Sequence, residues 1–251
     1  MPDFDPRLYQ PARQLLAGRV ILVTGAGSGI GAAAARAFAA HGATLILLGR
    51  TTRKLEAVHD EILAAGGPQP AIAVIDLARA QGPAYFDLAA QLRANYGRLD
   101  GLLHNAAILG ERTPIEHNDV GAWQQVLHVN LTAAFVLTRE LMPLLRASAD
   151  ASVIFTSSGV GRRGRAYWGA YAVSKFGIEG LAQVLADETR DATRIRFNCI
   201  NPGGTRTAMR RSAYPAELPE ARPEPAAIMA PYLYLMGPDS TGVTGQSIDC
   251  Q

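Results

Sequence analysis

Short apolar runs alternate with segments of helical period along almost the whole chain, and this alternation limits the possible folds more than any other feature. The apolar runs, rich in Val, Ile and Leu, cover residues 19–24, 43–48, 71–75, 99–104, 151–156 and 194–200. The helical segments cover residues 30–41, 52–64, 84–96, 120–146 and 170–190. Strands that are apolar on both faces and alternate with helices form parallel sheets with helices on both sides. We therefore expect a single α/β domain over residues 1–251, with a doubly wound parallel sheet of about seven strands.

The composition excludes several classes of partner. The net charge is +2 and the basic residues are scattered, whereas a nucleic-acid-binding protein needs a clustered basic face. No run approaches the roughly 20 apolar residues of a membrane span. The first residues include Asp and Pro where a secretory leader needs basic and apolar residues, which predicts a cytoplasmic protein. The two cysteines, Cys199 and Cys250, lack metal-ligand spacing, so we expect reduced thiols and no metal site.

A glycine-rich turn links the first predicted strand to the first predicted helix. Residues 24–31 read Thr-Gly-Ala-Gly-Ser-Gly-Ile-Gly, and an Ala-rich helix follows at once. Glycines allow a backbone to approach a pyrophosphate, and a helix N-terminus directs free N–H groups at it. Glycine also serves ordinary tight turns, but the strand–turn–helix context favours a dinucleotide site. The predicted contacts here are Gly25, Gly27, Ser28, Gly29, Ile30 and Gly31.

The end of the second predicted strand indicates which dinucleotide is bound. An acidic side chain at this point binds the ribose 2′-hydroxyl of NAD, whereas an arginine accommodates the 2′-phosphate of NADP. This sequence has Gly49 followed by Arg50, so no carboxylate repels a phosphate and a guanidinium is available to bind it. Arg50 could instead be a solvated residue that opens a helix. We expect NADP(H).

A Tyr-x-x-x-Lys pair provides a candidate acid/base. Tyr171 and Lys175 stand four residues apart in a predicted helix and therefore share one face. Free tyrosine has a pKa near 10, and we expect the nearby ammonium to favour the phenolate. Tyr171 could then exchange a proton with an alcohol or a carbonyl oxygen. The same spacing also occurs by chance as a surface pair.

An asparagine within an apolar helical segment is a further candidate. Asn130 follows Val129 and precedes Leu131, and a buried amide without partners costs about 1–3 kcal/mol. It is either a core residue satisfied by backbone groups or a residue with a function.

Together these motifs resemble the short-chain dehydrogenase/reductase family, whose glycine turn has the spacing Thr-Gly-x-x-x-Gly-x-Gly. The resemblance runs from about residue 9 to residue 245. Residues 9–11, 161–166, 183–188 and 203–210 are similar to the bacterial YciK-like group of that family. The resemblance implies a single-domain Rossmann fold that transfers a hydride between NADP(H) and a carbonyl compound or secondary alcohol. It also implies a homodimer or homotetramer that pairs through the helices over residues 120–146 and 170–190.

The resemblance also implies roles for particular residues. Tyr171 would be the acid/base, and Ser158, rather than its neighbour Ser157, would hold the substrate oxygen. Lys175 would tune the phenol and bind the nicotinamide ribose, and Asn130 would hold a helix distortion and a water that leads to Lys175. The remaining implied cofactor contacts are Asp76, Leu77, Asn105, Ala106, Ala107, Pro202, Gly203, Thr205 and Thr207, together with Tyr171 and Lys175. Asp76 could instead cap a turn, and His104 is expected to be structural.

The segment over residues 203–225 is rich in Pro, Arg and Glu and has weak periodicity. It follows the sixth predicted strand, at the edge where open α/β sheets bind ligands, and we interpret it as a substrate-binding lid. Arg162, Arg163 and Arg165 could bind an anionic group or belong to a solvated loop.

Two alternative functions remain open at this stage. The first is a non-catalytic NADP-binding protein that senses redox state, because an intact site does not prove turnover. The second is an enoyl reductase of the same family. The substrate itself is not evident from the sequence.

Overall fold

The computed structural model describes residues 4–190 and 193–251, which form one seven-stranded parallel sheet covered by helices on both sides. The strand order is β3-β2-β1-β4-β5-β6-β7. The strands are β1 (Val20–Thr24), β2 (Thr44–Gly49), β3 (Ala71–Val74), β4 (Gly101–His104), β5 (Ala151–Thr156), β6 (Ile195–Asn201) and β7 (Ser247–Asp249). The chain order reverses between β1 and β4, so the fold is doubly wound and has its ligand-binding crevice at the carboxyl ends of these two strands.

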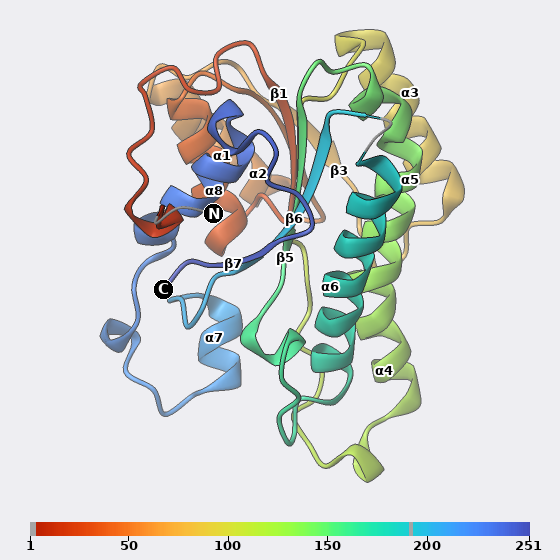
Figure 1. Cartoon of the computed structure of the whole chain (residues 1–251). Coiled ribbons are helices and arrows are strands. Elements are labelled where there is room, and N and C mark those ends of the chain that lie inside the picture. Colours follow the sequence, from red (N-terminus) through yellow and green to blue (C-terminus); the bar gives the residue numbers. More distant parts are fainter. Residues whose placement is uncertain (1–3, 191–192) are drawn as a thin grey trace.

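Two apolar layers hold the helices against the sheet. Figure 1 shows one group of helices on each side of the strands. One side carries α1 (Gly29–Ala40), α2 (Thr52–Ala64) and α8 (Ala230–Met236), and the other carries α3 (Gly82–Tyr96), α4 (Val120–Leu127), α5 (Ala133–Arg146) and α6 (Gly169–Thr189). Alternate strand residues fill the two layers, with Ile21 and Val23 in one and Leu22 in the other. A strand buried on both faces needs apolar residues throughout, which explains the continuous apolar runs.

All six strands expected from the sequence are present, to within about two residues at their ends. The seventh strand, β7, consists of three residues that are exposed or half-buried. A short polar edge strand has neither an apolar run nor a clear alternation, so its position could not be derived from the sequence. The predicted single-domain Rossmann architecture is confirmed.

The prediction of one continuous helix over residues 120–146 is wrong, because the helix is interrupted in its middle. A π-helical turn, His128–Thr132, separates α4 from α5, and the Ala133 N–H donates to the carbonyl of His128, five residues earlier. The apolar pattern continues through this turn, so hydrophobic periodicity alone gives no sign of it. The distortion is located around Asn130, where the resemblance implied one.

Two other helices were not expected from the sequence. They are α7 (Ala208–Ala213), which lies within the predicted lid and has six residues, and α8, which has seven and includes Pro231 in its first turn. Short helices lack enough turns for a clear 3.6-residue period. Over residues 4–190 and 193–251, no helix is both long enough and apolar enough to cross a membrane.

Candidate active site

The glycine turn between β1 and α1 is packed so tightly that side chains would not fit at several of its positions. Gly25 and Gly29 have φ angles of +66° and +55°, which L-residues with side chains rarely adopt. A Cβ at Gly31 would overlap the carbonyl oxygen of Gly25 and the side-chain amide of Asn105. The backbone therefore forms a bare surface at the N-terminus of α1, suited to a pyrophosphate.

Thr24 connects this turn to the end of β4. Its hydroxyl accepts hydrogen bonds from the backbone N–H groups of Asn105 and Ala106, at 3.0 and 3.1 Å, and donates to the carbonyl of Leu103. The two strands on either side of the switch point are thereby fixed relative to each other. Asn105 and Ala106 are held at the floor of the crevice.

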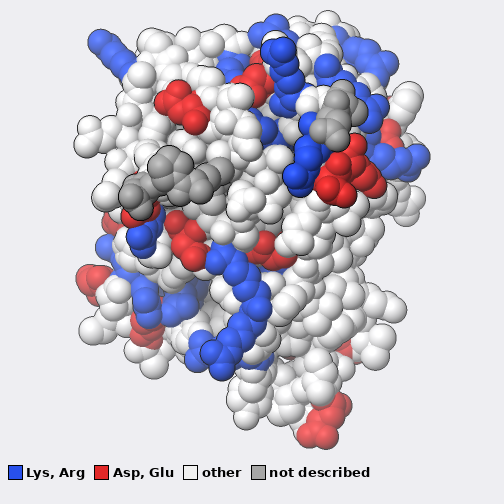
Figure 2. All heavy atoms as spheres, in the orientation of Figure 1, with Lys and Arg blue, Asp and Glu red and all other residues white. Residues whose placement is uncertain are grey.

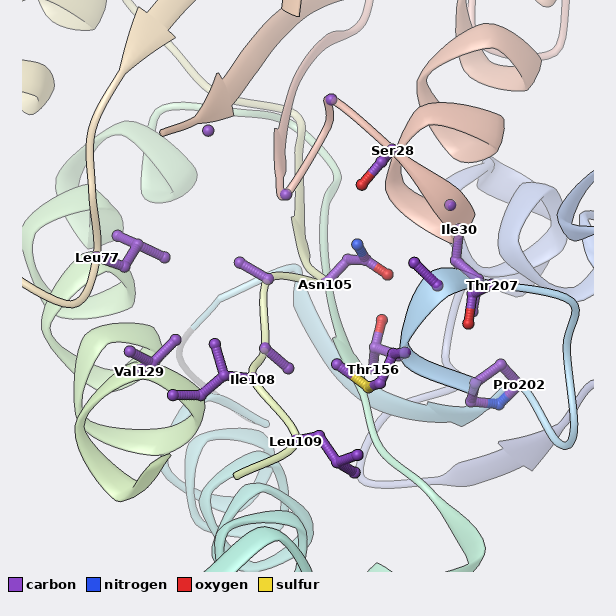
Figure 3. A pocket seen from close by; sticks show the side chains of 18 of the residues that line it. Ser28, Ile30, Leu77, Asn105, Ile108, Leu109, Val129, Thr156, Pro202 and Thr207 are labelled. Atoms are coloured by element: carbon purple, nitrogen blue, oxygen red, sulfur yellow. The ribbon is translucent and has the colours of Figure 1, made fainter. Parts of the chain in front are cut away.

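A cavity of about 420 Å³ runs along the carboxyl ends of the strands. Figure 3 shows Ser28, Ile30 and Thr207 on one side of it, Leu77, Ile108 and Val129 on the other, and Asn105 between them. All the predicted cofactor contacts line this cavity except Gly31, which packs behind Gly25. Of the predicted catalytic residues, Ser158, Tyr171 and Lys175 line it and Asn130 does not.

The end of the cavity beside β2 carries two cations. Arg50 and Lys54 both line it, and among the residues that the structure describes neither has a carboxylate within ion-pair distance. A Cβ on Gly27 would lie 2.9 Å from the Cβ of Lys54, so Lys54 stands directly over the glycine turn. Sequence reasoning missed Lys54, although it follows Arg50 by one helical turn. Asp76 also lines the cavity, and its carboxylate accepts a hydrogen bond from the Ala78 N–H, as expected for a turn cap.

At the opposite end, Tyr171, Ser158 and Lys175 form a buried polar group. Tyr171 is 9% exposed and Lys175 is 3% exposed. The Lys175 Nζ donates to the carbonyl of Thr156 at 2.7 Å and lies 5.5 Å from the centroid of the Tyr171 ring. The i,i+4 spacing on α6 brings the two side chains together, as predicted.

The pKa of Tyr171 shifts in the direction opposite to our expectation. Burial raises the pKa of Tyr171 to about 12, and a hydrogen bond with the Ser158 side chain works in the opposite direction. Burial also lowers the pKa of Lys175 to about 8, against the attraction of Cys199 and Glu179. Desolvation outweighs the hydrogen bond with Ser158, because removing a phenolate from water costs more free energy than this hydrogen bond returns. The phenol is therefore protonated at neutral pH.

Asn130 uses its whole amide to join the catalytic helix to the loop after β4. Its Oδ1 accepts from the Ile108 N–H at 2.8 Å, and its Nδ2 donates to the Ile108 carbonyl and to Ser174 Oγ at 3.0 and 3.1 Å. Ser174 in turn donates to the carbonyl of Tyr171 at 2.7 Å. The amide therefore links the backbone of Tyr171, through Ser174, to Ile108 in the cavity wall. The predicted water link to Lys175 stays a prediction.

His104 has a structural role, as expected. It is buried, stacks on Phe155 at 4.8 Å, and its Nε2 is 2.8 Å from the Thr138 hydroxyl. That hydroxyl donates to the carbonyl of Ala134, so the imidazole Nε2 carries the proton that it shares with Thr138. Burial lowers the pKa of His104 to about 3, so the ring is neutral.

Apolar and aromatic side chains from three segments enclose the space beside Tyr171. Trp168 packs against it at 5.7 Å between ring centroids, and Leu109, Met209 and Ala213 complete the wall. Met209 and Ala213 belong to the segment expected to bind substrate, whereas Leu109 and Trp168 were not predicted, because single apolar residues outside periodic segments carry no recognisable pattern. They give this end of the cavity the character of a substrate site.

Several residues of the segment over 203–225, among them Met209 and Ala213, line this space, and the function of the segment as a lid stays a prediction. Thr207 caps its helix α7, and the Thr207 hydroxyl accepts a hydrogen bond from the Arg210 N–H. Glu217 accepts from both Arg210 and Arg222 at 2.6–2.8 Å, and these bonds lower the pKa of Glu217 to about 2. The segment is thus fastened internally by ion pairs rather than by apolar burial.

The C-terminal residue closes the loop after β6. The Gln251 side chain donates to the carbonyl of Pro202 at 2.5 Å and to the Thr205 hydroxyl at 3.3 Å. A Cβ on Gly203 would lie 2.7 Å from the Gln251 amide nitrogen. Gln251 therefore packs against the loop that carries Pro202, Gly203 and Thr205.

Comparison with known proteins identifies the family. The model of the short chain dehydrogenase family matches residues 19–218. The chain belongs to this family. It is 52% identical to the oxidoreductase YciK of Escherichia coli (strain K12), over 97% of this chain and 96% of that protein.

Solved structures agree with this assignment. A structure from Pseudomonas syringae, described as a short chain dehydrogenase, is 58% identical, has a TM-score of 0.96 and covers 99% of both chains. Another, from Escherichia coli CFT073 and complexed with NADPH, is 52% identical with a TM-score of 0.93, and covers 96% of this chain and all of the other. The expected relationship to YciK-like short chain dehydrogenases is therefore confirmed.

Proposed function

We propose that this short chain dehydrogenase reduces a carbonyl compound to a secondary alcohol with NADPH, and that Tyr171 is its acid/base. The observation that carries the proposal is the position of Tyr171, with Ser158 and Lys175, at one end of a cavity whose other end is a glycine turn. A reacting carbonyl between the phenol and the nicotinamide would have a proton donor and a hydride donor on its two sides.

The residues along the cavity suit NADP(H). The bare turn at Gly25 and Gly29 accepts a pyrophosphate, and Arg50 and Lys54 are placed to bind a 2′-phosphate. The complex of a 52% identical relative with NADPH supports this choice. Thr205 and Thr207 would face the nicotinamide, and Lys175 would bind its ribose. When bound, the cofactor supplies the hydride that forms the new C–H bond.

The protein's own residues bind the carbonyl oxygen and deliver the proton. The Ser158 hydroxyl donates to the substrate oxygen and stabilises the negative charge that develops on it. Tyr171 donates its phenolic proton to that oxygen, which completes the alcohol. The Lys175 ammonium stabilises the phenolate that remains until it regains a proton. Trp168 and Met209 keep water from the reacting groups.

The protonation state of Tyr171 agrees with carbonyl reduction. Burial raises the pKa of Tyr171 to about 12, so at neutral pH the phenol carries the proton that reduction would transfer to the substrate oxygen.

The proposal is tested by a screen of purified protein against NADPH and a panel of ketones, aldehydes and quinones. We expect steady NADPH consumption, with one alcohol formed per NADPH consumed, for at least one compound. NADPH binding without consumption of any compound would favour the redox-sensing alternative. An α,β-unsaturated ketone in the panel distinguishes carbonyl reduction from the enoyl reductase alternative. A carbonyl reductase would form the allylic alcohol, whereas an enoyl reductase would form the saturated ketone.

A further inference from the structure

A cluster of aromatic and cationic side chains lies next to the cavity, and Trp168 and Arg210 of this cluster line the cavity itself. The Arg112 guanidinium carbon lies 4.7 Å from the Trp168 ring centroid and 4.9 Å from that of Tyr214. Arg112 also donates to the carbonyl of Ala213, which lines the cavity. The Arg210 guanidinium carbon lies 3.7 Å from the centroid of the Tyr214 ring, and Arg165 donates to the Tyr214 hydroxyl at 3.0 Å.

The positive charges at this place exceed the negative ones. Glu217 is shared by Arg210 and Arg222. Over residues 4–190 and 193–251, no carboxylate lies within ion-pair distance of Arg112 or Arg165. The neighbouring Arg162 differs, because it pairs with Glu179 and Asp249 away from the cavity. Figure 2 shows basic side chains gathered on this part of the surface, around the position of α7.

A buried donor at the same place also lacks an acceptor. Trp168 is 7% exposed and lines the cavity, and its indole N–H has no hydrogen-bond partner among the described residues. Leaving a buried donor unsatisfied costs about 1–3 kcal/mol, so a polar acceptor on a ligand would stabilise it. An apolar substrate would leave this N–H without a partner and the two guanidinium groups without counter-charge.

We propose that the carbonyl substrate carries an anionic oxygen group, a carboxylate or a phosphate, which binds to Arg112, Arg165 and the Trp168 N–H. The proposal rests on the proposed function for the carbonyl and adds the class of compound that carries it. Guanidinium groups bind both anions through paired N–H donors, and stacking on Trp168 and Tyr214 fixes the plane of Arg112. The carbonyl reaches Tyr171 while the anion stays at the mouth of the cavity.

The test measures binding to protein loaded with NADP⁺, so it does not depend on turnover. Trp123 and Trp168 are the two tryptophans of the chain, and Trp123→Phe leaves Trp168 as the only tryptophan, which is excited selectively over the tyrosines. This variant is titrated with dihydroxyacetone phosphate against dihydroxyacetone. It is also titrated with a series of straight-chain oxo acids of increasing length against their methyl esters. We expect at least one anion to quench Trp168 with a Kd roughly tenfold or more below that of its uncharged partner.

Variants assign the preference to particular residues. Arg112→Gln and Arg165→Gln, each made separately, should reduce the preference for the anion about tenfold while the Kd of NADP⁺ stays unchanged. Arg163→Gln removes the same charge from the same loop at an exposed residue without an ion pair in the described structure, and it should keep the preference. Circular dichroism of each variant checks that it is folded.

Three outcomes would overturn the proposal. One is equal affinity for charged and uncharged partners across the whole series. Another is an equal loss of the preference for the anionic ligand in Arg163→Gln, which would indicate a general electrostatic attraction by the basic surface instead of a specific binding site. The third is weaker NADP⁺ binding in Arg112→Gln with an unchanged anion preference, because the arginine would then serve the cofactor. The phosphate and carboxylate arms distinguish the two anion classes, and turnover of a bound anion with NADPH tests the proposed reaction separately.

Discussion

At the scale of single residues, burial controls the chemistry of the site. Tyr171 and Lys175 are close together, yet their pKa values shift in opposite directions, and both shifts favour the uncharged form. The pairing of these residues could be predicted from their spacing in the sequence. The direction of the tyrosine shift could not, because it depends on packing against residues that are distant in sequence, such as Leu109 and Ala213.

The two neighbouring serines should differ in their effect on turnover. Ser158 hydrogen-bonds with Tyr171, whereas Ser157 is buried and its hydroxyl has no partner among the described residues. We expect Ser158→Ala to lower kcat by about 10²–10³-fold, since it removes a donor to the substrate oxygen. Ser157→Ala should retain turnover close to that of the wild type. The reverse order in steady-state kinetics would assign the role to Ser157.

Replacing Lys175 should change how stability depends on pH. The folded pKa of about 8 lies below the unfolded value near 10.4, so between these values the unfolded chain binds more protons and stability rises with pH. The free energy of unfolding of Lys175→Met, relative to that of the wild type, should therefore be highest below pH 8. This difference should shrink by about 2–3 kcal/mol by pH 10, because each unit of pKa shift corresponds to about 1.4 kcal/mol. Urea unfolding of both proteins without cofactor, at a series of pH values, measures this difference. A difference that stays constant from pH 7 to pH 10 would contradict the lowered pKa of Lys175.

At the scale of elements, the positions of the long apolar strands and of most long helices could be predicted from residue patterns. Those elements bury whole faces, so their composition repeats with the period of the structure. The π turn at His128–Thr132, the short helix α7 and the edge strand β7 depend on a few contacts, such as those of Asn130 with Ile108. Such contacts join residues far apart in the chain, and a local pattern does not contain them.

The junction of β2 and α2 should determine the choice of dinucleotide. Arg50→Asp should reverse the preference from NADP to NAD, because it replaces the phosphate partner with a carboxylate. Lys54→Gln should weaken NADP(H) binding about tenfold and leave NAD binding unchanged. Arg53→Gln, which changes an exposed residue of the same turn, is the control. An unchanged NADP preference in Arg50→Asp, measured by titration with both cofactors, would contradict this assignment.

At the scale of the whole molecule, α5 and α6 expose large apolar side chains. Phe135, Val173, Phe176 and Val184 are each 45–54% exposed. Apolar side chains gathered on one side of a fold indicate a surface for another chain. The homodimer or homotetramer that the family resemblance implied stays a prediction, and these side chains are candidates for its interface.

We expect light scattering to give the mass of a dimer or a tetramer. Phe176→Asp should lower that mass, because a buried charge at an apolar interface lacks a partner. Phe86→Asp introduces the same charge on α3, at a residue that is 64% exposed, and it should leave the mass unchanged. A monomeric wild type would contradict the prediction.

The most direct test of the account is the turnover of Tyr171→Phe with NADPH and the best carbonyl compound from the screen. This variant keeps the aromatic ring and removes the proton donor. We expect kcat to fall by about 10²–10⁴-fold while the Kd of NADPH stays within about twofold, and Tyr167→Phe, at an exposed position, to remain active. Turnover of Tyr171→Phe close to that of the wild type would contradict the assignment of Tyr171 as the proton donor.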